Sequence, residues 1–248
     1  MLTEQRFEII CRLVNERGSI TVTELKDILD TSESTVRRDI TALHKAGKLT
    51  KVFGGAVALE QAVIAYEETV AQKLEVNSEA KRAVARYAAA LVKPDDFVYL
   101  DAGTATGYLL DYLNEHRATY VTNAVSHARR MAAKGLKVIL IGGELKDSTE
   151  AVVGSVALQM VSQYHFTKGF FGTNAISRKV GLTTPDPNEA MVKQKAMEQC
   201  LKKYVLADYS KFNRVSPVTF ASFSEAEILT EDMPEEYKNY DHVTAVGY

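Results

Sequence analysis

Residues 32–40 read Ser-Glu-Ser-Thr-Val-Arg-Arg-Asp-Ile, and this stretch decides the fold that we predict for the first part of the chain. Ser32 is placed to cap a helix, because its hydroxyl can accept a hydrogen bond from a backbone N–H of the first turn. The helix then has one apolar stripe, formed by Val36, Ile40 and Leu43. Its outward side chains are polar or charged: Glu33, Ser34, Arg37 and Arg38.

Two further helices are predicted before this stretch. From Thr3 to about Gly18, apolar residues recur at helical spacing, namely Phe7, Ile10, Cys11 and Val14. Thr21 and Glu24 have the spacing of a capping box, which predicts a second and shorter helix that ends near Asp30. A short polar turn then leads into the helix capped by Ser32, so the last two helices have the arrangement of a helix-turn-helix.

A β-hairpin is predicted after the third helix. Residues 48–53 alternate polar and apolar side chains, a Gly-Gly pair follows at 54–55, and residues 56–59 are again apolar. Such a hairpin is the wing of a winged helix-turn-helix. Lys48 and Lys51 lie on it, where they would meet DNA phosphates and add affinity that depends on salt but not on base sequence.

Periodicity alone leaves two interpretations open, a small packing domain and a DNA-binding domain. In a helix-turn-helix the second helix enters the major groove by its N-terminal end, where Arg can bind guanine edges bidentately. Arg37 and Arg38 suit that role. The formal net charge of the chain is only −2, so DNA binding must rest on local charge. Residues 37–51 supply it, with Asp39 as the one acid among five basic residues, Arg37, Arg38, Lys45, Lys48 and Lys51.

Residues 59–77 contain neither Pro nor Gly and fit a weakly amphipathic helix or an extended arm. Such a segment serves as a dimer contact, as a lever between domains or as a plain linker, and the sequence does not choose among them. We take it as a linker arm between a DNA-binding domain at residues 1–58 and a larger domain at residues 78–248.

The larger domain repeats one pattern, in which a short apolar strand ends in small or polar residues and a helix follows. This pattern predicts an α/β fold. The strand ends fall at residues 97–100, 120–121, 138–141, 170–171 and 205–207. In open parallel sheets, ligands bind beyond the carboxyl ends of the strands, where helix N-termini offer backbone N–H groups to anions. We therefore expect the binding site of this domain there.

The residues that follow these strand ends suit a phosphorylated sugar. Gly103, Thr104 and Thr106 open a helix and would supply amides and hydroxyls to a phosphate. Asp101 and Asn123 suit sugar hydroxyls, and Lys211 would supply a countercharge. Each signal taken singly also fits ordinary turn chemistry. Their recurrence on successive strand ends favours a site.

Several of these segments resemble the DeoR family of bacterial regulators, over nearly the whole chain. They are Ser32 with Thr35-Val36-Arg37-Arg38-Asp39-Ile40, Asp101-Ala-Gly-Thr, Thr122-Asn123, Gly142-Gly143, Gly181 through Glu189 and Lys193, and Asp208-Tyr-Ser-Lys211. The resemblance implies that the first domain binds operator DNA. With the wing included, the predicted DNA-binding residues are Ser32, Ser34, Thr35, Arg37, Arg38, Lys48 and Lys51. Asp39 is expected to orient an arginine or to cap locally.

The resemblance also implies a C-terminal domain similar in fold to ribose-5-phosphate isomerase and glucosamine-6-phosphate deaminase, one that binds a phosphorylated sugar. The predicted effector-binding residues are Asp101, Gly103, Thr104, Thr106, Thr122, Asn123, Gly142, Gly172, Glu189, Lys193, Asp208 and Lys211. Residues 142–154 resemble regulators of fructose operons, which implies fructose 1-phosphate as the effector. Two positions depart from the family. Ala105 lacks a usual threonine hydroxyl, and Phe53 replaces a common histidine and is expected to pack.

The prediction is therefore a cytoplasmic repressor of a sugar-catabolism operon, acting as a homo-oligomer and released from operator DNA by a phosphorylated sugar. The alternative is a sugar-phosphate isomerase or deaminase with a DNA-binding appendage, in which carboxylates and Lys211 would act on the substrate. No cofactor, catalytic residue or metal site is predicted, because the histidines and the two cysteines, Cys11 and Cys200, lack ligand spacing. No apolar stretch is long enough for a bilayer, so no membrane partner is expected.

Overall fold

The structure is a computed structural model that describes residues 2–58 and 69–247. The chain divides into two compact units, which are treated separately below. The DNA-binding unit comprises the described residues up to 58, and residues 213–215 are grouped with it. The sensor unit comprises residues 69–212 and 216–247. The predicted boundaries at 58 and 77 remain predictions, and most of the predicted arm, residues 59–68, lies outside the described residues.

Three helices and a three-stranded antiparallel sheet make up the described part of the DNA-binding unit. They are α1 (Thr3–Arg17), β1 (Ser19–Thr21), α2 (Val22–Leu29), α3 (Glu33–Lys45), β2 (Thr50–Val52) and β3 (Gly55–Val57), with the strand order β1-β3-β2. The apolar stripes of the helices meet in one core that includes Ile10, Leu25, Val36 and Ile40. This arrangement confirms the predicted winged helix-turn-helix.

The helix starts of this unit are capped as the sequence predicts. Thr21 Oγ1 accepts a hydrogen bond from the Glu24 backbone N–H at 3.1 Å, and the Glu24 carboxylate accepts one from the Thr21 N–H at 2.8 Å. Ser32 Oγ accepts from the Thr35 N–H at 3.2 Å, which fixes the start of α3.

Strand β1 was not predicted. It is only three residues long, and it pairs with β3 along Ser19–Thr21. The close approach of these two strands depends on Gly55, because a Cβ there would lie 2.3 Å from the Ile20 carbonyl oxygen. The Gly-Gly pair read as a turn signal thus also allows a third strand to join the wing.

A seven-stranded parallel sheet forms the centre of the sensor unit, in the order β15-β14-β12-β9-β4-β5-β6. Its strands are β4 (Phe97–Leu100), β5 (Thr119–Thr122), β6 (Lys137–Leu140), β9 (Phe166–Gly172), β12 (Cys200–Leu206), β14 (Glu227–Thr230) and β15 (Val243–Ala245). Every strand pair in this sheet is parallel, which brings the five predicted strand ends to one edge. The predicted α/β fold is confirmed.

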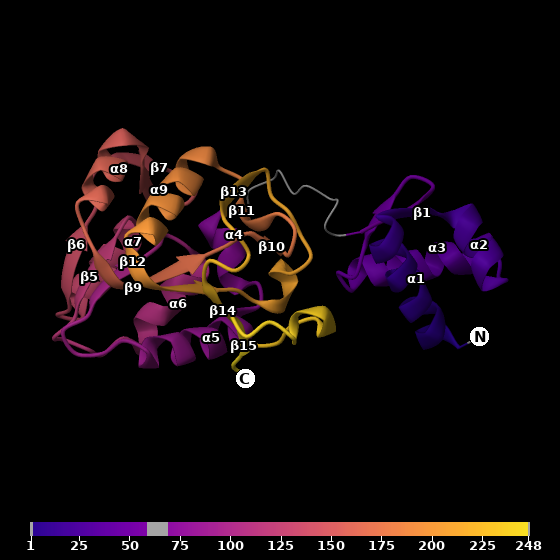
Figure 1. Ribbon diagram of the computed structural model, residues 1–248, viewed down its shortest axis with the longest axis horizontal. Helices are drawn as coiled ribbons and strands as arrows, with labels where there is room; N and C mark the ends of the chain where they lie inside the picture. Colours follow the sequence, from indigo (N-terminus) through magenta and orange to yellow (C-terminus); the bar gives the residue numbers. More distant parts are fainter. Residues whose placement is uncertain (1, 59–68, 248) are drawn as a thin grey trace. The chain divides into compact units, whose positions relative to one another are not determined.

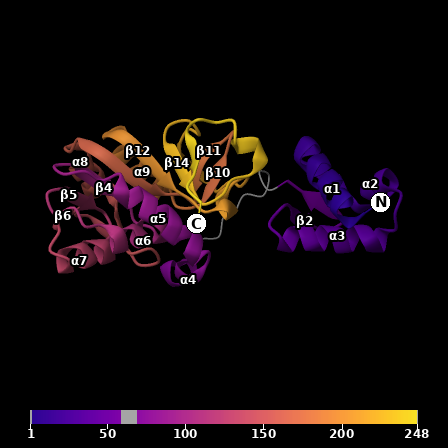
Figure 2. The ribbon, with the colours of Figure 1, turned by 90° about the horizontal axis from the view of Figure 1, so that it is seen from below.

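Helices cover both faces of the sheet (Figure 1 and Figure 2). Alternate residues of a strand face opposite cores, so that Phe171 packs with α8 and α9 whereas Phe170 packs with α5 and α6. The helices of the sensor unit are α4 (Val70–Glu75), α5 (Ser78–Ala90), α6 (Thr104–Tyr112), α7 (Val125–Ala133), α8 (Gly154–Ser162) and α9 (Pro187–Glu198), with short 3-10 turns η2 (Tyr209–Lys211) and η3 (Glu235–Tyr237).

Two small antiparallel sheets complete the sensor unit. One contains β10 (Ala175–Ser177), β11 (Gly181–Thr184) and β13 (Val218–Ala221), and the other pairs β7 (Glu144–Lys146) with β8 (Ala151–Val153). The loops that lead into these small sheets leave the carboxyl ends of β9 and β6. They therefore add walls to the region where the sequence predicts a ligand.

Candidate DNA-binding surface and ligand pocket

The outward face of α3 carries the predicted base-reading arginines. The Arg37 side chain is 58% exposed and pairs with Glu33 one turn earlier, with 3.4 Å between Nη2 and the carboxylate oxygen. Arg38 Nε donates to the Ser34 carbonyl at 3.3 Å. Exposed pairs of this kind are worth at most about 1 kcal/mol, so both guanidinium groups can exchange these partners for DNA at small cost.

The first turn of α3 gathers hydroxyl groups. Ser32 Oγ lies 2.9 Å from Ser34 Oγ and 2.9 Å from Thr35 Oγ1. Hydroxyls and backbone N–H groups at a helix start are suited to phosphate oxygens. The structure thus brings Ser32, Ser34 and Thr35 together at the end of α3 that a DNA groove would receive.

The wing lies against the same helix. Lys51 Nζ on β2 donates to Thr41 Oγ1 on α3 at 3.0 Å, and Lys48 is exposed in the turn before β2. Lys51 is therefore on the side of the unit that carries α3. Sequence analysis missed Thr41, although its position four residues after Arg37 places it on the same face of the helix.

Asp39 is buried and holds Arg6 in a bidentate pair. Arg6 Nε donates to Asp39 Oδ2 at 2.7 Å and Arg6 Nη2 donates to Oδ1 at 3.3 Å. This confirms the expectation that Asp39 orients an arginine. Because the pair joins α1 to α3, it fixes the angle at which the outward face of α3 is presented.

Phe53 does not pack, which corrects the sequence expectation. Its side chain is fully exposed, with a relative exposure of 107%. The reason is local, because Phe53 and Gly54 form the two-residue turn between β2 and β3 and so extend beyond the sheet. The tip of the wing therefore presents an aromatic ring to solvent.

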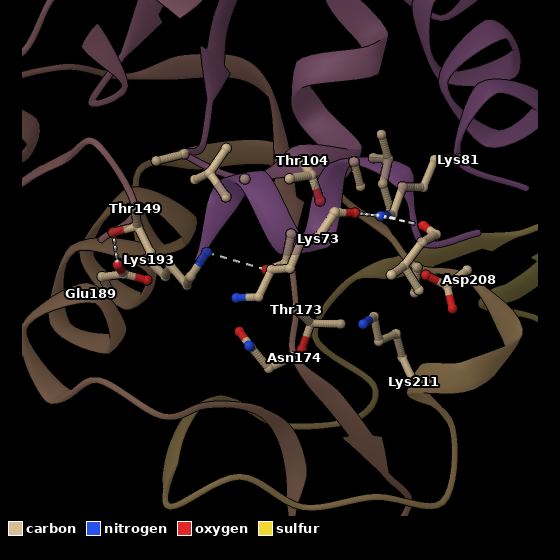
Figure 3. A pocket seen from close by; sticks show the side chains of 18 residues that line it. Lys73, Lys81, Thr104, Thr149, Thr173, Asn174, Glu189, Lys193, Asp208 and Lys211 are labelled. Carbon is tan, nitrogen blue, oxygen red and sulfur yellow. Dashed lines mark hydrogen bonds between the residues drawn. The ribbon is translucent and has the colours of Figure 1, made fainter. Parts of the chain in front are cut away.

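One pocket lies at the carboxyl ends of the parallel strands in the sensor unit (Figure 3). Seven predicted effector residues line it, and they follow β4, β9 and β12 or lie on α9: Gly103, Thr104, Gly172, Glu189, Lys193, Asp208 and Lys211. No side chain caps the start of α6 at Gly103 and Thr104, and the first N–H groups of a helix have no acceptor within the helix. This edge of the pocket is suited to an anion.

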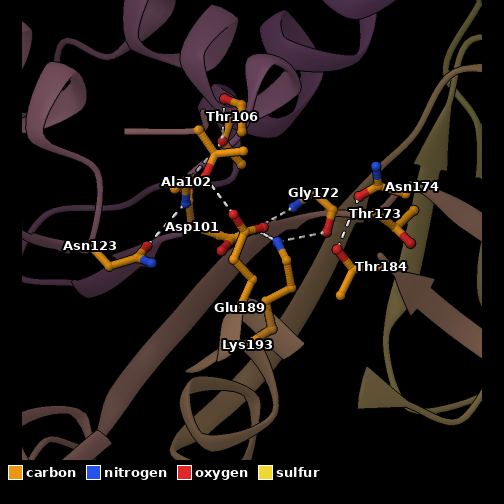
Figure 4. A network of polar contacts seen from close by, with 12 residues as sticks. Asp101, Ala102, Thr106, Asn123, Gly172, Thr173, Asn174, Thr184, Glu189 and Lys193 are labelled. Carbon is orange, nitrogen blue, oxygen red and sulfur yellow. Dashed lines mark hydrogen bonds and ion pairs between the residues drawn. The ribbon is translucent and has the colours of Figure 1, made fainter. Parts of the chain in front are cut away.

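A buried ion pair supports the pocket (Figure 4). Lys193 Nζ on α9 pairs with Asp101 Oδ2, and the two side chains are only 5% and 2% exposed. The same carboxylate oxygen accepts from the Gly172 N–H at 3.0 Å, and Lys193 Nζ also donates to the Gly172 carbonyl at 3.3 Å. Burial raises the pKa of Asp101, and the adjacent Lys193 ammonium opposes this rise.

Two carboxylates line the pocket, those of Glu189 and Asp208, and both are held by hydrogen bonds. Glu189 accepts from Lys146 Nζ at 3.1 Å and from the Thr149 hydroxyl. Asp208 accepts from Asn77 Nδ2 at 2.9 Å and from the Ser210 N–H at 3.0 Å, which starts the η2 turn that carries Lys211. The positions of Glu189 and Lys211 are therefore fixed by neighbours from distant parts of the chain.

The other predicted effector residues are not among those that line the pocket, and their assignment as ligand contacts stays a prediction: Asp101, Thr106, Thr122, Asn123 and Gly142. The polar side-chain atoms of three of them bond to the protein itself. Asn123 accepts from the Ala102 N–H at 3.0 Å and donates to the Val152 carbonyl at 3.1 Å. Thr106 Oγ1 donates to the Asp101 carbonyl at 2.7 Å, and the Thr122 hydroxyl accepts from the Ala124 N–H at 3.1 Å. These residues hold the backbone behind the pocket.

Sequence analysis missed several polar residues that line the pocket: Lys73, Lys81, Thr149, Thr173 and Asn174. Thr173 and Asn174 directly follow β9, so the strand-end argument that selected Gly172 extends to them. Lys73 lay in the segment taken as an arm, and Lys81 lies on the following helix. No sequence signal connects these two lysines with residues a hundred positions later.

His127 is a buried histidine close to the start of α6. It is 6% exposed, and burial lowers its pKa to about 4. Its ring packs against Gly107, where a Cβ would come within 3.2 Å of Nε2, and its Nδ1 has no hydrogen-bond partner among the described residues. The imidazole is therefore neutral at neutral pH.

Neither a metal centre nor a membrane span is found in the part of the chain that the structure describes. Among residues 2–58 and 69–247, no three His, Cys, Asp or Glu side chains are grouped in a way that could hold a metal ion. In the same residues, no helix is both long enough and apolar enough to cross a bilayer.

Fold and sites together define a class of protein, in which a winged helix-turn-helix is joined to an α/β unit with a lysine-rich polar pocket. Residues 6–62 match the family model of the DeoR-like helix-turn-helix domain, and residues 76–233 match that of the DeoR C terminal sensor domain. The chain therefore belongs to the DeoR family of transcriptional regulators, which confirms the resemblance noted in the sequence.

Full-length relatives agree with this assignment. The chain is 38% identical to a Bacillus subtilis (strain 168) protein named "Uncharacterized HTH-type transcriptional regulator FruR", over 99% of this chain and 98% of that protein. It is 33% identical to the lactose phosphotransferase system repressor of Staphylococcus aureus (strain N315), over 96% and 95% of the two chains. These relatives are similar along the whole chain, not only in the helix-turn-helix.

Solved structures that resemble part of the chain include two ribose 5-phosphate isomerases. The enzyme from Neisseria gonorrhoeae has a TM-score of 0.42 at 14% identity, covering 57% of this chain and 56% of that chain. The enzyme from Methanocaldococcus jannaschii has a TM-score of 0.40 at 14% identity, covering 55% of each chain. At such identities the similarity concerns fold alone.

Proposed function

We propose that this protein is a sequence-specific repressor of a sugar-catabolism operon and that a phosphorylated sugar bound in the sensor unit relieves the repression. The observation that carries the effector class is the composition of the pocket. Lysines from separate elements, Lys73, Lys193 and Lys211, meet there beside the uncapped start of α6. Glu189 and Asn174 line the same pocket and suit sugar hydroxyls. A phosphate and a polyol in one small ligand would match both features.

On the DNA side, α3 enters the major groove of double-stranded operator DNA. Arg37 and Arg38 contact base edges, Ser32, Ser34 and Thr35 bind phosphate oxygens at the helix start, and Lys48 and Lys51 bind phosphates from the wing. The exposure of these side chains on one helix and one adjacent hairpin supports this assignment. In this proposal the protein acts in the cytoplasm, on operator DNA.

The relatives support the direction of regulation, and the sequence resemblance suggests the first effector to test. Lactose phosphotransferase system repressors match the chain over nearly its full length, which supports repression. Fructose 1-phosphate is the first effector to test, because residues 142–154 resemble regulators of fructose operons. The protein binds as a homo-oligomer with one helix-turn-helix per half-site, and the effector stabilises a form of the chain in which the two helices no longer fit both half-sites.

The test uses the full chain and an operator recovered by selection from random double-stranded DNA. Hexose and pentose phosphates, including fructose 1-phosphate and tagatose 6-phosphate, are screened by thermal shift and then by release of that operator. Lys211→Ala should bind the operator as the parent does but should not release it with the effector. Lys202→Met, at an exposed position outside the pocket, is the matched control. Normal release of Lys211→Ala would contradict the assigned pocket.

A catalytic function is the second candidate, because carboxylates and lysines line one pocket as they would in a sugar-phosphate isomerase or deaminase. Glu189 and Asp208 are the carboxylates concerned. The experiment is to follow isomerisation of pentose and hexose phosphates and deamination of amino sugar phosphates. If the protein turns over one of these substrates and Asp208→Asn abolishes the turnover, the protein is an enzyme. That result would contradict our proposal of a regulator without catalytic activity.

A further inference from the structure

Helix α4 contributes a wall to the ligand pocket. Val70 and Lys73 on this helix, and Val76 directly after it, line the pocket together with residues from β4, β9, β12 and α9. Figure 3 shows Lys73 and Lys211 reaching the same pocket from α4 and η2. Val70, Lys73 and Val76 belong to the last part of the segment 59–77 that we took as a linker arm, so part of that segment lines the pocket.

The contacts that hold α4 come from the segments that form the pocket. Its first N–H, at Val70, donates to the Ser148 carbonyl at 3.3 Å, and Ser148 precedes the pocket residue Thr149. The Tyr108 hydroxyl on α6 donates to the Leu74 carbonyl at 2.8 Å. Hydrogen bonds thus connect α4 to two segments that border the pocket.

The end of α4 is held by a buried lysine. Lys81 on α5 is 5% exposed, and its Nζ donates to the Lys73 carbonyl and, at 2.7 Å, to the Val76 carbonyl. A positive charge is favourable at the carboxyl end of a helix. Because Lys81 also lines the pocket, the charge that stabilises α4 lies next to the ligand site.

Apolar burial contributes little to α4. The helix has six residues; its Leu74 side chain is 42% exposed, and that of Val76, just beyond its end, is 49% exposed. Helices of this length are not stable alone in water. Its start is capped by Thr69 and Gln72, and the polar contacts above add to this cap. Elements of this kind open at low free-energy cost, so ligand contacts can change their stability.

Position in the chain gives α4 a second property. It is the first helix of the sensor unit that the structure describes after residue 58, and the chain that enters it comes from the DNA-binding unit. Resting on the proposed function, we propose that α4 couples the two units: Lys73 binds the anionic group of the effector, the effector thereby fixes α4, and the fixed helix restrains the chain that leads to the helix-turn-helix.

Hydrogen–deuterium exchange on the full chain tests this coupling, with fructose 1-phosphate as the first probe and inorganic phosphate as the second. In the parent protein, binding of the sugar phosphate should slow amide exchange in residues 70–76 at least tenfold. Lys73→Met should weaken binding at least tenfold and abolish that protection. Lys202→Met, again the matched control, should behave as the parent does.

A second variant separates coupling from binding. Insertion of Gly-Ser-Gly-Ser between residues 62 and 63 lengthens the connection without touching the pocket. It should leave effector affinity within twofold and keep the protection of α4, but it should reduce effector-dependent operator release at least fivefold. Release as efficient as in the parent would overturn the proposal, because the restraint would then not pass through the chain.

The outcomes distinguish this inference from the proposed function on which it rests. If no sugar phosphate binds or releases the operator, the proposed function fails and the inference fails with it. If fructose 1-phosphate or another sugar phosphate releases the operator while exchange in residues 70–76 is unchanged, or while Lys73→Met responds normally, only the role of α4 is overturned.

Discussion

The DNA-binding surface and the ligand pocket use the same kinds of side chain in opposite ways. On the DNA-binding surface, the candidate residues lie between positions 32 and 51 and are mostly exposed. In the pocket, they come from positions 70 to 211, and several are buried. The first site is built by one helix and its neighbouring hairpin, whereas the second exists only when the whole sheet has formed.

One ion pair from each site shows how this difference affects stability. Arg37 and Glu33 are 58% and 50% exposed, and such a pair contributes at most about 1 kcal/mol. Lys193 and Asp101 are 5% and 2% exposed, and removing one partner from such a pair typically costs about 3–5 kcal/mol. A basic residue on the DNA-binding surface can thus change with little effect on stability, whereas one in the pocket also supports the fold.

The largest expected effect is the loss of the buried pair. Lys193→Met should lower the free energy of unfolding of the sensor unit by about 3–5 kcal/mol, because it leaves the Asp101 carboxylate without its partner. All tyrosines of the chain lie at or after residue 66, so urea unfolding followed by tyrosine fluorescence reports on the sensor unit. Asp101→Asn added to Lys193→Met should recover part of the loss. If Lys193→Met lowers the free energy of unfolding no more than Lys202→Met does, the buried pair does not contribute to stability as expected.

On the DNA-binding surface, the effect should fall on binding instead. Arg37→Ala should weaken binding to the selected operator by about 1–3 kcal/mol and leave binding to random DNA nearly unchanged. Lys51→Ala should weaken both and lower the slope of log K against log salt by about 1. Fluorescence anisotropy at several salt concentrations measures both variants. Equal losses of Arg37→Ala on operator and random DNA would exclude Arg37 from base reading.

A smaller effect, dependent on pH, should come from His127. Its pKa is about 4 in the folded chain, against about 6.5 for an ordinary histidine. The unfolded chain therefore binds more protons between pH 6.5 and 4, and stability is complete above pH 6.5 and falls as the pH falls through this window. At pH 5 the loss is about 2 kcal/mol.

The control for this prediction is His127→Gln, which cannot titrate. Between pH 7.5 and 5, the variant should lose about 2 kcal/mol less stability than the parent, again measured by urea unfolding and tyrosine fluorescence. Parallel pH profiles of the two proteins would mean that the imidazole is accessible to protons in the folded state.

The smallest expected effect concerns the tip of the wing. Phe53→Ala should change the free energy of unfolding of the DNA-binding unit by less than about 0.5 kcal/mol, since the ring is fully exposed. Circular dichroism at 222 nm follows this unit together with the rest of the chain. Destabilisation by several kcal/mol, as for a buried phenylalanine, would restore the sequence expectation that Phe53 packs.

Sequence patterns predicted the DNA-binding unit well because its structure is local. The stripe of Val36, Ile40 and Leu43 and the cap at Ser32 need only neighbouring residues, and both occur as expected. The prediction that Phe53 packs was wrong, because the sequence does not show whether another part of the fold covers a turn residue. Strand β1 was missed because three residues carry too short a pattern.

In the sensor unit, sequence patterns predicted the location of the pocket but not all of the residues that line it. The strand-end argument located the pocket, because parallel strands bring their carboxyl ends to one edge whatever their order. It did not distinguish residues that line the pocket from those behind it, since Asn123 and Thr104 follow their strands in equivalent ways. Lys73 and Lys81 reach the pocket only because the tertiary fold brings them next to residues far along the chain. A local sequence pattern carries no information about such contacts.

The residues behind the pocket also have a consequence for engineering. Asp101, Thr106 and Asn123 bond to backbone groups, and Asp101 also pairs with Lys193, so they support the cavity from behind its lining. Asn174 lies in front of them, on a loop outside the main sheet. A designer who wants a biosensor for another metabolite can therefore randomise that position and its neighbour Thr173, and keep the scaffold behind them unchanged.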